Sequence, residues 1–309
     1  MQRAFILGPT ASDKTRVALE LAPLIDAEII SLDSMLVYRG MDLGTAKPSK
    51  KELGLVKHHM IDVVDPLEDF SVAKYVDACK EIEQDLSNRG KSALYVGGTT
   101  MWFKALVFGL IDMPDIPSEL RESLSRRLKE EGAMRLRCEL QSIDAVSYDR
   151  IHPNDDRRLL RALETWHVTG KPLSYWQKQW HEDNNLNELA WVLHWPRSIL
   201  HKRVAERFSL MIEQGLLEEI KNILLEGGFG KTASKAIGYK QMLQYLKGDF
   251  DLETALSKSV SQTNVLIRRQ MTWYRSFDNL RFVDMEDNVS VEYLATKLAS
   301  EFASYYEGA

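Results

Sequence analysis

A short loop after an apolar run carries the clearest chemistry in this chain of 309 residues. It reads Gly-Pro-Thr-Ala-Ser-Asp-Lys-Thr over residues 8–15 and follows the apolar residues 4–7. The backbone N–H groups of such a loop, with the N-terminus of the helix that follows, form a concave site for phosphate oxygens. We expect Lys14 to reach a terminal phosphate and the Thr15 hydroxyl to ligate Mg²⁺. The loop therefore predicts a protein that handles a phosphate or a diphosphate.

One position of this loop departs from the usual pattern. The motif G-x-x-x-x-G-K-[ST] has glycine at its sixth place, where this chain has Asp13. A carboxylate ~5 Å from one diphosphate charge costs roughly 3 kcal/mol at an effective dielectric constant of ~20, before any compensation by Lys14 or Mg²⁺. If the position needs a positive φ, Asp tolerates it better than most residues other than glycine. We therefore expect Asp13 to weaken diphosphate binding, and glycine at this position to tighten it.

Two further strand ends carry polar residues. Asp33 follows the strand candidate 27–32 and begins the segment Asp-Ser-Met-Leu-Val-Tyr-Arg-Gly, and Gly97-Gly98-Thr99 follows the run 92–96. In a parallel sheet these positions lie at the same edge as the phosphate loop. There Asp33 could act as a base or a metal-shell carboxylate, or it could simply cap a helix N-terminus. Position alone leaves both interpretations open.

Several segments combine basic with amide or aromatic side chains. They cover residues 151–164, 235–242 and 268–275, and Arg157 and Arg161 of the first share one helical face. Such surfaces suit single-stranded RNA, whose phosphates meet arginine or lysine and whose bases stack on aromatic rings. For residues 151–164 the alternative is an ordinary solvated face, and for the segment 268–275 it is that Met271 and Trp273 are core residues of an amphipathic helix.

A later helical pattern, residues 198–215, carries two arginines one turn apart. Arg203 and Arg207 stand at i and i+4, so they share one face. If this helix passes the phosphate loop, Arg207 could neutralise a leaving diphosphate.

The elements that must position these residues alternate between strand and helix patterns. This alternation predicts an α/β fold, a P-loop NTPase-like parallel sheet with flanking helices. Residues 118 to about 180 read as all-helical, which predicts an inserted helical domain of residues 118–188 within a discontinuous core of residues 1–117 and 189–309. Predicted strands cover 4–8, 27–32, 92–97, 189–195 and 280–283, and predicted helices cover 15–24, 71–88, 99–108 and 291–305, with further helices within 198–277.

The bulk properties fit a cytoplasmic protein. The net charge is −5, which does not exclude a local basic groove. No stretch approaches the ~18–20 apolar residues of a membrane span, and the apolar run near residue 4 leaves no room for a signal peptide. The two cysteines, Cys79 and Cys138, exclude a disulfide framework, and we expect both to be buried.

Together these segments closely resemble tRNA dimethylallyltransferases, also called tRNA isopentenyl transferases. The resemblance runs from residue 4 to about residue 284, and its most specific segments are 33–48 and 152–155. It implies transfer of the dimethylallyl group of dimethylallyl diphosphate to N6 of the adenosine immediately 3′ of the anticodon, in tRNAs that read codons beginning with U. It also implies assistance by Mg²⁺, a helical insertion that clamps the anticodon stem-loop, and a monomer.

The resemblance assigns roles to residues of this chain. It implies that Asp33 is the general base and that Thr10, Lys14 and Arg207 are the other catalytic residues. It also implies that Thr15 ligates the metal ion. The diphosphate falls to Gly8, Pro9, Thr10, Ala11, Ser12, Asp13, Lys14 and Thr15. Contacts to tRNA fall to Asp33, Ser34, Met35, Leu36, Thr99, Arg121, Arg157, Arg158, Leu159, Leu160, Arg161, Lys235, Gly238, Tyr239 and Lys240.

Other functions remain open at the level of sequence. A catalytically impaired tRNA-binding member of the family is one, because of Asp13, and a P-loop small-molecule kinase is another. An adenylate isopentenyltransferase is a third, although the helical insertion argues against it. Smaller departures from the family pattern are Trp102, where tyrosine is usual, and Asn264-Val265, where Arg-Gln is usual.

Overall fold

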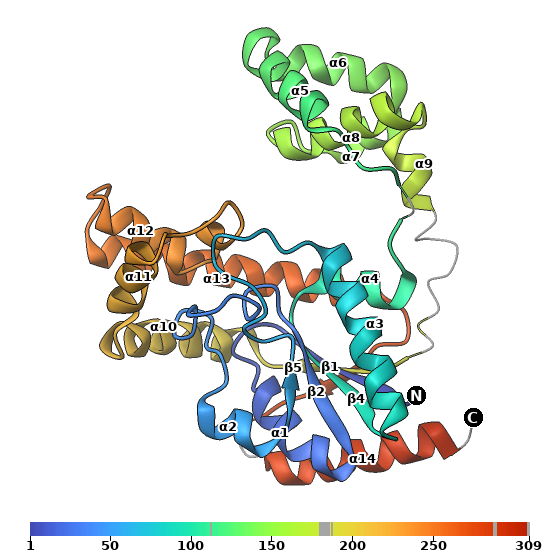
Figure 1. The fold of residues 1–309 in the computed structure, drawn as a ribbon, viewed down its shortest axis with the longest axis vertical. Helices are drawn as coiled ribbons and strands as arrows, with labels where there is room; N and C mark the ends of the chain where they lie inside the picture. The colour runs from blue at the N-terminus through green and yellow to red at the C-terminus, as the bar shows by residue number, and fades with distance from the viewer. Residues whose placement is uncertain (112, 179–185, 187, 287–288, 308–309) are drawn as a thin grey trace. The chain divides into compact units, whose positions relative to one another are not determined.

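A computed structural model describes residues 1–111, 113–178, 186, 188–286 and 289–307 (Figure 1). The chain forms two compact units, one of residues 1–107 with 185–309 and one of residues 108–184. The sequence placed the corresponding boundaries at 117/118 and 188/189. No helix of the described residues is both long enough and apolar enough to cross a membrane.

The first unit is built on one parallel sheet, which confirms the α/β prediction. The strand order is β3-β2-β4-β1-β5-β6, and every pairing is parallel. The edge strand β3 was not predicted, because it has two residues and no apolar run. The strands are β1 (Arg3–Leu7), β2 (Ala27–Leu32), β3 (His58–His59), β4 (Ser92–Gly97), β5 (Leu189–His194) and β6 (Arg281–Asp284).

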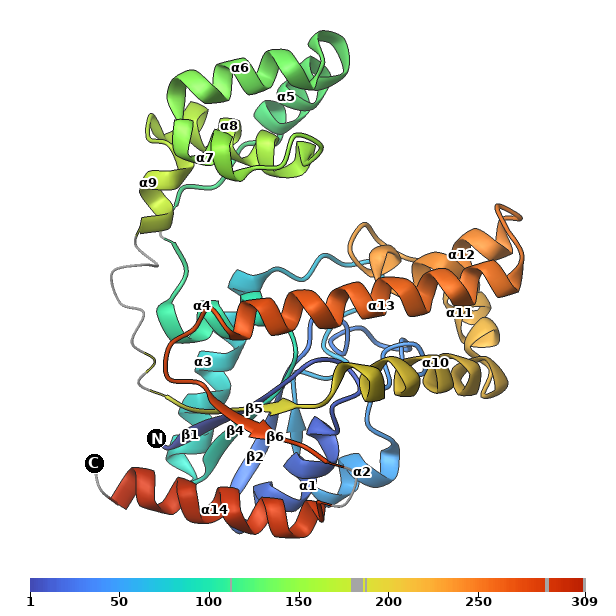
Figure 2. The same ribbon diagram turned by 180° about the vertical axis from the view of Figure 1, so that it is seen from behind.

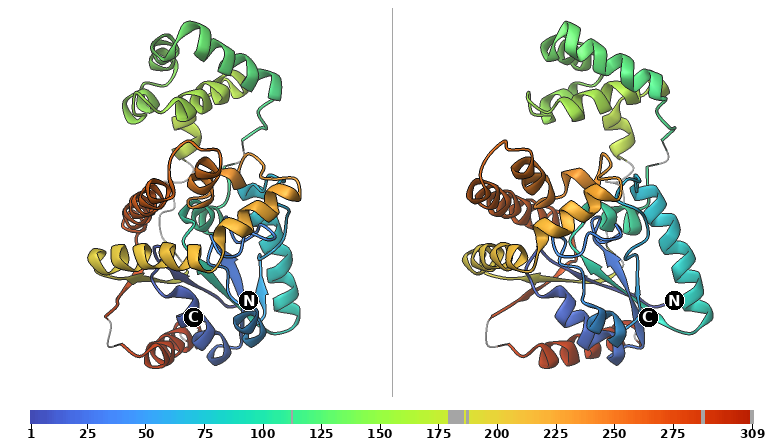
Figure 3. Two further views of the ribbon diagram at one scale, coloured as in Figure 1. Left: turned by 90° about the vertical axis from the view of Figure 1, so that its left-hand side faces the viewer. Right: turned by 60° about the vertical axis from the view of Figure 1, so that its left-hand side comes forward.

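Helices cover both sides of this sheet. Helices α1 (Lys14–Leu24) and α14 (Val291–Glu307) pack on one another, and α3 (Val72–Asn88) packs against β4 on the opposite side of the strands (Figure 3). Residues 4–7 of the central strand β1 are fully buried between these layers, as a continuous apolar run predicts. Shorter helices α2 (Lys50–Leu55) and α4 (Thr100–Phe108) follow β2 and β4.

Strand register brings three chemically important positions to one edge. Leu7 of β1 and Leu32 of β2 are both aligned with Gly97 of β4. Residues 8, 33 and 98 are therefore the first residues after these three strands and lie at the same edge of the sheet. A Cβ on Gly97 would stand 2.1 Å from the Leu32 carbonyl oxygen, so only glycine lets the chains approach this closely. The sheet therefore places the phosphate loop, Asp33 and the double glycine side by side.

A second helical layer completes this unit. Helices α10 and α13 run side by side (Figure 2), and α12 also packs on α13. The elements are α10 (Arg197–Glu213), α11 (Leu216–Leu225), the 3₁₀ turn η1 (Ala233–Lys235), α12 (Tyr239–Leu246) and α13 (Leu252–Tyr274).

The described part of the second unit is all-helical and has its own core. Arg137 is buried and donates to the carbonyl oxygens of Tyr148 and Ile151, at 3.2 and 3.1 Å, which fixes the turn before His152. The core residues are Leu124, Leu136, Leu140, Ile151, Leu159, Ala162 and Leu163. The helices are α5 (Ser118–Glu131), α6 (Ala133–Ile143), α7 (Ala145–Arg150), α8 (Asp156–Thr169) and α9 (Leu173–Lys178).

The two cysteines have different environments. Cys79 of α3 is buried, as expected, and burial raises the pKa of its thiol to about 12. Cys138 of α6 is exposed, so the expectation that it is buried is wrong. It follows the core residues Leu136 and Arg137 on α6 but faces away from them, which the helical pattern alone did not resolve.

Candidate active site

The phosphate loop lies between β1 and the N-terminus of α1. Ala11 and Asp13 both have φ of 63°, in the left-handed region, and Asp13 precedes α1 without capping it through its side chain. Within the loop, the Ser12 hydroxyl donates to the Pro9 carbonyl oxygen at 2.8 Å. A Cβ on Gly8 would stand 2.7 Å from Ser12 Oγ, so a larger residue there would displace this contact. The first N–H groups of α1 thus keep their capacity for an anion.

Two cationic side chains converge on this loop. Lys14 Nζ lies 2.6 Å from the Pro9 carbonyl oxygen, and burial lowers the pKa of Lys14 to about 8, against the opposing effect of Asp33. Arg207 of α10 lies 3.5 Å from Thr10 Oγ1 and 3.3 Å from the Thr45 carbonyl oxygen. Burial lowers the pKa of Arg207 too, and Asp33 again raises it. The loop is therefore a desolvated positive site, on which the carboxylates of Asp33 and Asp13 both act.

Asp33 caps a turn and not a helix. Its Oδ1 accepts a hydrogen bond from the Met35 N–H at 2.9 Å, and residues 34–37 form a turn. The neighbouring Ser34 N–H donates to Thr99 Oγ1 at 3.0 Å, which joins the ends of β2 and β4. Oδ2 of Asp33 accepts no hydrogen bond from any described residue. This oxygen is thus available to a substrate proton.

The carboxylate of Asp13 has a partner that the sequence argument did not include. Asp13 Oδ2 forms an ion pair with Arg203 Nη1 at 2.7 Å, and each side chain keeps about a quarter of its surface exposed, 25% and 28%. The expected compensation was by Lys14 or Mg²⁺. Asp13 does raise the pKa of Lys14, as that expectation requires, and Arg203 on α10, one turn before Arg207, adds the direct ion pair.

Two residues of α13 hold the loop from its other side, and sequence reasoning missed their role. The Gln270 side chain accepts from the Thr10 N–H at 3.3 Å and donates to the Gly98 carbonyl oxygen at 2.8 Å. The Tyr274 hydroxyl lies 3.4 Å from the Gly8 carbonyl oxygen, and both side chains are buried. The Arg-Gln-x-Thr-Trp segment was a usable signal, but it was interpreted through its arginines.

The segment after Asp33 is held mainly by structural contacts. Glu219 of α11 accepts from the N–H groups of Asp42 and Leu43, at 3.1 and 2.7 Å. Lys47 is buried and donates to the Tyr38 carbonyl oxygen and to Asp42. These contacts fix the loop whose Thr45 carbonyl oxygen meets Arg207.

Some of the predicted tRNA contacts in the first unit face outward and some do not. Lys235 and Lys240 are exposed, and residues 34–36 and Thr99 are partly exposed. The prediction for Gly238 and Tyr239 is wrong for a direct surface contact, because both are buried and the Tyr239 hydroxyl bonds to Glu219. The aromatic ring fills the space left by Gly44, whose absent Cβ would stand 2.4 Å from it.

The candidates in the second unit divide in the same way. Arg121, Arg157 and Arg158 are exposed, and Leu160 and Arg161 are partly exposed. Leu159 is 1% exposed and belongs to the core, so its prediction as a contact residue is wrong. The helix face toward the core takes every third or fourth residue, and Leu159 falls on it.

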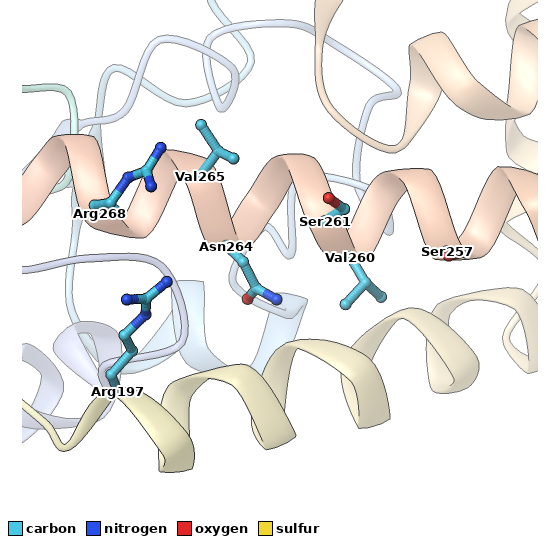
Figure 4. A pocket seen from close by; sticks show the side chains of 7 residues that line it. All are labelled: Arg197, Ser257, Val260, Ser261, Asn264, Val265 and Arg268. Carbon is cyan, nitrogen blue, oxygen red and sulfur yellow. The ribbon is translucent and has the colours of Figure 1, made fainter.

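A cleft of about 380 Å³ lies between α10 and α13. Arg197 of α10 and Arg268 of α13 are among its lining residues, and Asn264 points from α13 toward α10 (Figure 4). Asn264 Oδ1 is buried and has no hydrogen-bond partner among the described residues. Ser257, Val260, Ser261 and Val265 complete its lining.

Comparison with known proteins gives the family of this chain. The family model described as IPP transferase matches residues 36–277. The curated tRNA dimethylallyltransferase of Francisella tularensis subsp. novicida is 40% identical over 287 residues, 91% of this chain and 93% of that protein. That of Francisella philomiragia is 39% identical over 288 residues, with the same coverage of each.

Solved structures are similar over the whole chain. The tRNA isopentenylpyrophosphate transferase of Bacillus halodurans has a TM-score of 0.73 and 34% identity, and the match covers 99% of this chain and 97% of that one. A eukaryotic dimethylallyltransferase described as acting on tRNA has a TM-score of 0.81 at 23% identity, covering 100% and 80%. At that identity the second likeness supports the fold alone.

Proposed function

The chain belongs to the IPP transferase family, and from that premise we propose that it is a tRNA dimethylallyltransferase. Its donor is dimethylallyl diphosphate. Its acceptor is N6 of the adenosine immediately 3′ of the anticodon, in tRNAs that read codons beginning with U. The curated relatives carry the transferase name, and the site geometry supplies the groups that this reaction needs.

One observation carries the proposal: two desolvated cations and a carboxylate with a free oxygen meet at the end of β1. Lys14 and Arg207 both lie within the electrostatic influence of Asp33. An exocyclic amine of adenine is a poor nucleophile, so the leaving group must depart readily. Cations fixed in a low-dielectric site stabilise the charge that develops on the departing diphosphate.

The proposed reaction balances as a simple substitution. The bond between C1 of the dimethylallyl group and the diphosphate oxygen breaks, and that oxygen keeps the electron pair. The N6–C1 bond forms, and Asp33 accepts the N6 proton. Lys14, Arg207 and the amides of residues 10–15 hold the diphosphate, with Thr10 oriented by Arg207. The adenosine must leave its stack to expose N6 to this site.

Mg²⁺ fits the donor set at the loop. The Thr15 side chain is partly exposed, and its hydroxyl bonds to no described residue, so it can serve as a ligand. Magnesium bound with a substrate's phosphates keeps several water ligands and needs few from the protein. When bound, the ion would add positive charge to the diphosphate and so favour its departure.

We infer that tRNA meets the exposed cations of both units. In the first unit these are Lys235 and Lys240, and in the second they are Arg121, Arg157 and Arg158. Base-edge contacts to the flipped adenosine fall to the partly exposed residues 34–36 and Thr99. A cytoplasmic location follows from the substrate, and a monomer stays a prediction.

The transfer assay tests this proposal directly. Labelled dimethylallyl should pass from its diphosphate to an anticodon stem-loop with adenosine 3′ of the anticodon. The same stem-loop with guanosine at that position should stay unlabelled, because it offers no N6 amine. Binding of the stem-loop without any transfer would instead identify an impaired member of the family. Phosphoryl transfer from ATP to a small molecule would identify a kinase, which the comparisons do not favour.

A further inference from the structure

Asp13, at the sixth place of the phosphate loop, is charged and forms an ion pair. Its backbone has the left-handed conformation that glycine prefers. Asp13 has φ of 63° and ψ of 19°, and Asp is among the few residues that enter this region at modest cost. Its carboxylate meets Arg203 at 2.7 Å. The chain thus accommodates Asp13 in backbone geometry and in charge, by two separate means.

Arg203 is itself held in place. Its guanidinium lies over the Trp195 ring, 3.8 Å from the ring centroid, and Nη1 lies 3.4 Å from the Ala11 carbonyl oxygen. Trp195 is 4% exposed and its Nε1 donates to the Ser12 carbonyl oxygen at 3.3 Å. Three successive loop residues are therefore fastened to the start of α10 by one arginine and one tryptophan. A stacked, hydrogen-bonded guanidinium loses little freedom on pairing.

The two arginines of this helix face have separate partners. Arg207 contacts Thr10 and Thr45, whereas Arg203 contacts Ala11 and Asp13. Arg207 therefore faces the diphosphate side of the loop while the charge of Arg203 is directed at the Asp13 carboxylate. Without Arg203, a carboxylate about 25% exposed would stand at the loop with no paired cation.

We propose that Asp13 and Arg203 act as one unit, in which Arg203 is the positioning residue that makes an aspartate at this place compatible with diphosphate binding. This inference rests on the proposed diphosphate site. It replaces the simple expectation that Asp13 alone weakens binding. Removing Arg203 should be harmful only while Asp13 is present.

A double-mutant cycle tests this unit, with inorganic pyrophosphate and Mg²⁺ as the ligand in titration calorimetry. We expect Arg203→Ala to weaken pyrophosphate binding by roughly tenfold or more, because it leaves an unpaired carboxylate at the loop. The double variant Asp13→Gly/Arg203→Ala should return to within about threefold of the parent chain, so the two effects are not additive. Arg203→Lys, which keeps the charge but loses the stacked guanidinium, should recover only part of the affinity that Arg203→Ala loses.

Controls separate this effect from loss of charge or of fold. Lys202→Ala removes a neighbouring exposed cation of α10, which pairs with Glu206, and should leave the affinity unchanged. Thermal unfolding of the four ligand-free proteins of the cycle gives a second coupling that needs no ligand. There Arg203→Ala should lower the melting temperature more in the parent chain than beside Asp13→Gly.

The outcomes distinguish the inference from the function on which it rests. Equal weakening in Arg203→Ala and in the double variant would mean that Arg203 binds the diphosphate itself, and would overturn the inference alone. Unchanged binding in Arg203→Ala would do the same. A parent chain that binds no pyrophosphate would overturn the proposed diphosphate site, and this inference with it.

Discussion

At the scale of single residues, the site is a balance of charges in a poorly solvated place. The negative charge of Asp33 raises the pKa of both Lys14 and Arg207, and that of Asp13 also raises the pKa of Lys14. The other nearby carboxylate, on Asp13, is directed at Arg203. The loop therefore carries an excess of positive charge, which an anionic diphosphate would neutralise.

Diphosphate affinity is expected to fall as the pH rises through about 8. Burial lowers the pKa of Lys14 to about 8, and only the protonated amine attracts the diphosphate. Affinity should therefore be constant well below this pH and fall by up to about tenfold per pH unit above it, until the higher pKa of the complex is reached. Pyrophosphate titration from about pH 7 to about pH 9.5 measures this.

The matched control for this titration is Lys14→Arg. A guanidinium stays charged over the whole range, so any remaining binding should lose the inflection near pH 8. If the parent chain and Lys14→Arg show the same pH profile, the lysine is not the titrating group.

At the scale of elements, α13 holds the phosphate loop through hydrogen bonds, and α10 supplies arginines to the same loop. Gln270 joins the Thr10 N–H to the Gly98 carbonyl oxygen across two strand ends. A Cβ on Gly98 would stand 2.4 Å from Gln270 Nε2, so the glycine makes room for this side chain. The double glycine of the sequence thus serves a close approach by a helix that lies far along the chain.

Gln270→Ala is expected to lower kcat/KM for the diphosphate by about tenfold and to destabilise the fold by ~1–3 kcal/mol. It leaves the buried Gly98 carbonyl oxygen without its donor and the Thr10 amide without its acceptor. Steady-state kinetics and chemical unfolding measure the two effects. Thr272→Ala, two residues along the same helix and exposed, should change neither. Kinetics equal to those of the parent chain would refute a positioning role for Gln270.

The elements themselves were largely predictable. The runs 4–7, 27–32 and 92–97 are mostly apolar because their strands are buried on both faces, and such runs are clear in a sequence even where Glu28 or Ser31 interrupts one. β3 could not be found, since His58-His59 becomes a strand only through its pairing with β2. A strand of two residues is too short to produce a recognisable alternation in the sequence.

The site was predictable where one local motif defines it and not where distant segments meet. The phosphate loop and Asp33 follow from strand ends, whereas the contacts of Gln270 and Arg203 depend on how α13 and α10 pack. Tyr239 and Leu159 lie in basic segments, but their side chains fill cores. A sequence motif includes both the residues that contact a ligand and the residues that support them. Only the packing in the structure distinguishes the two groups.

At the scale of the whole molecule, two units carry the predicted RNA contacts, and each has its own hydrophobic core. The helical unit depends on Leu159, which is 1% exposed among the residues of that core. Leu159→Ala should destabilise this unit by ~2–5 kcal/mol, since it leaves a cavity. Limited proteolysis of residues 108–184 would follow the loss. A variant with normal proteolysis but weak RNA binding would show that Leu159 touches RNA after all.

The exposed arginines of α8 should control the salt dependence of RNA binding. Removing a phosphate contact lowers the slope of log K against log salt by about 0.7–0.9. The double variant Arg157→Ala/Arg158→Ala should therefore bind an anticodon stem-loop more weakly and with a shallower slope. Arg16→Ala, an exposed arginine of α1, serves as the control and should change neither. An unchanged slope in the double variant would place the RNA elsewhere on the molecule.

The most direct test of the central claim is single-turnover transfer of labelled dimethylallyl to an anticodon stem-loop by this chain and by Asp33→Ala. We expect the parent chain to transfer the label to N6 and Asp33→Ala to be slower by about 10²–10⁴-fold. Equal transfer rates for the two proteins would contradict it, because the carboxylate at the end of β2 would then take no part in the reaction.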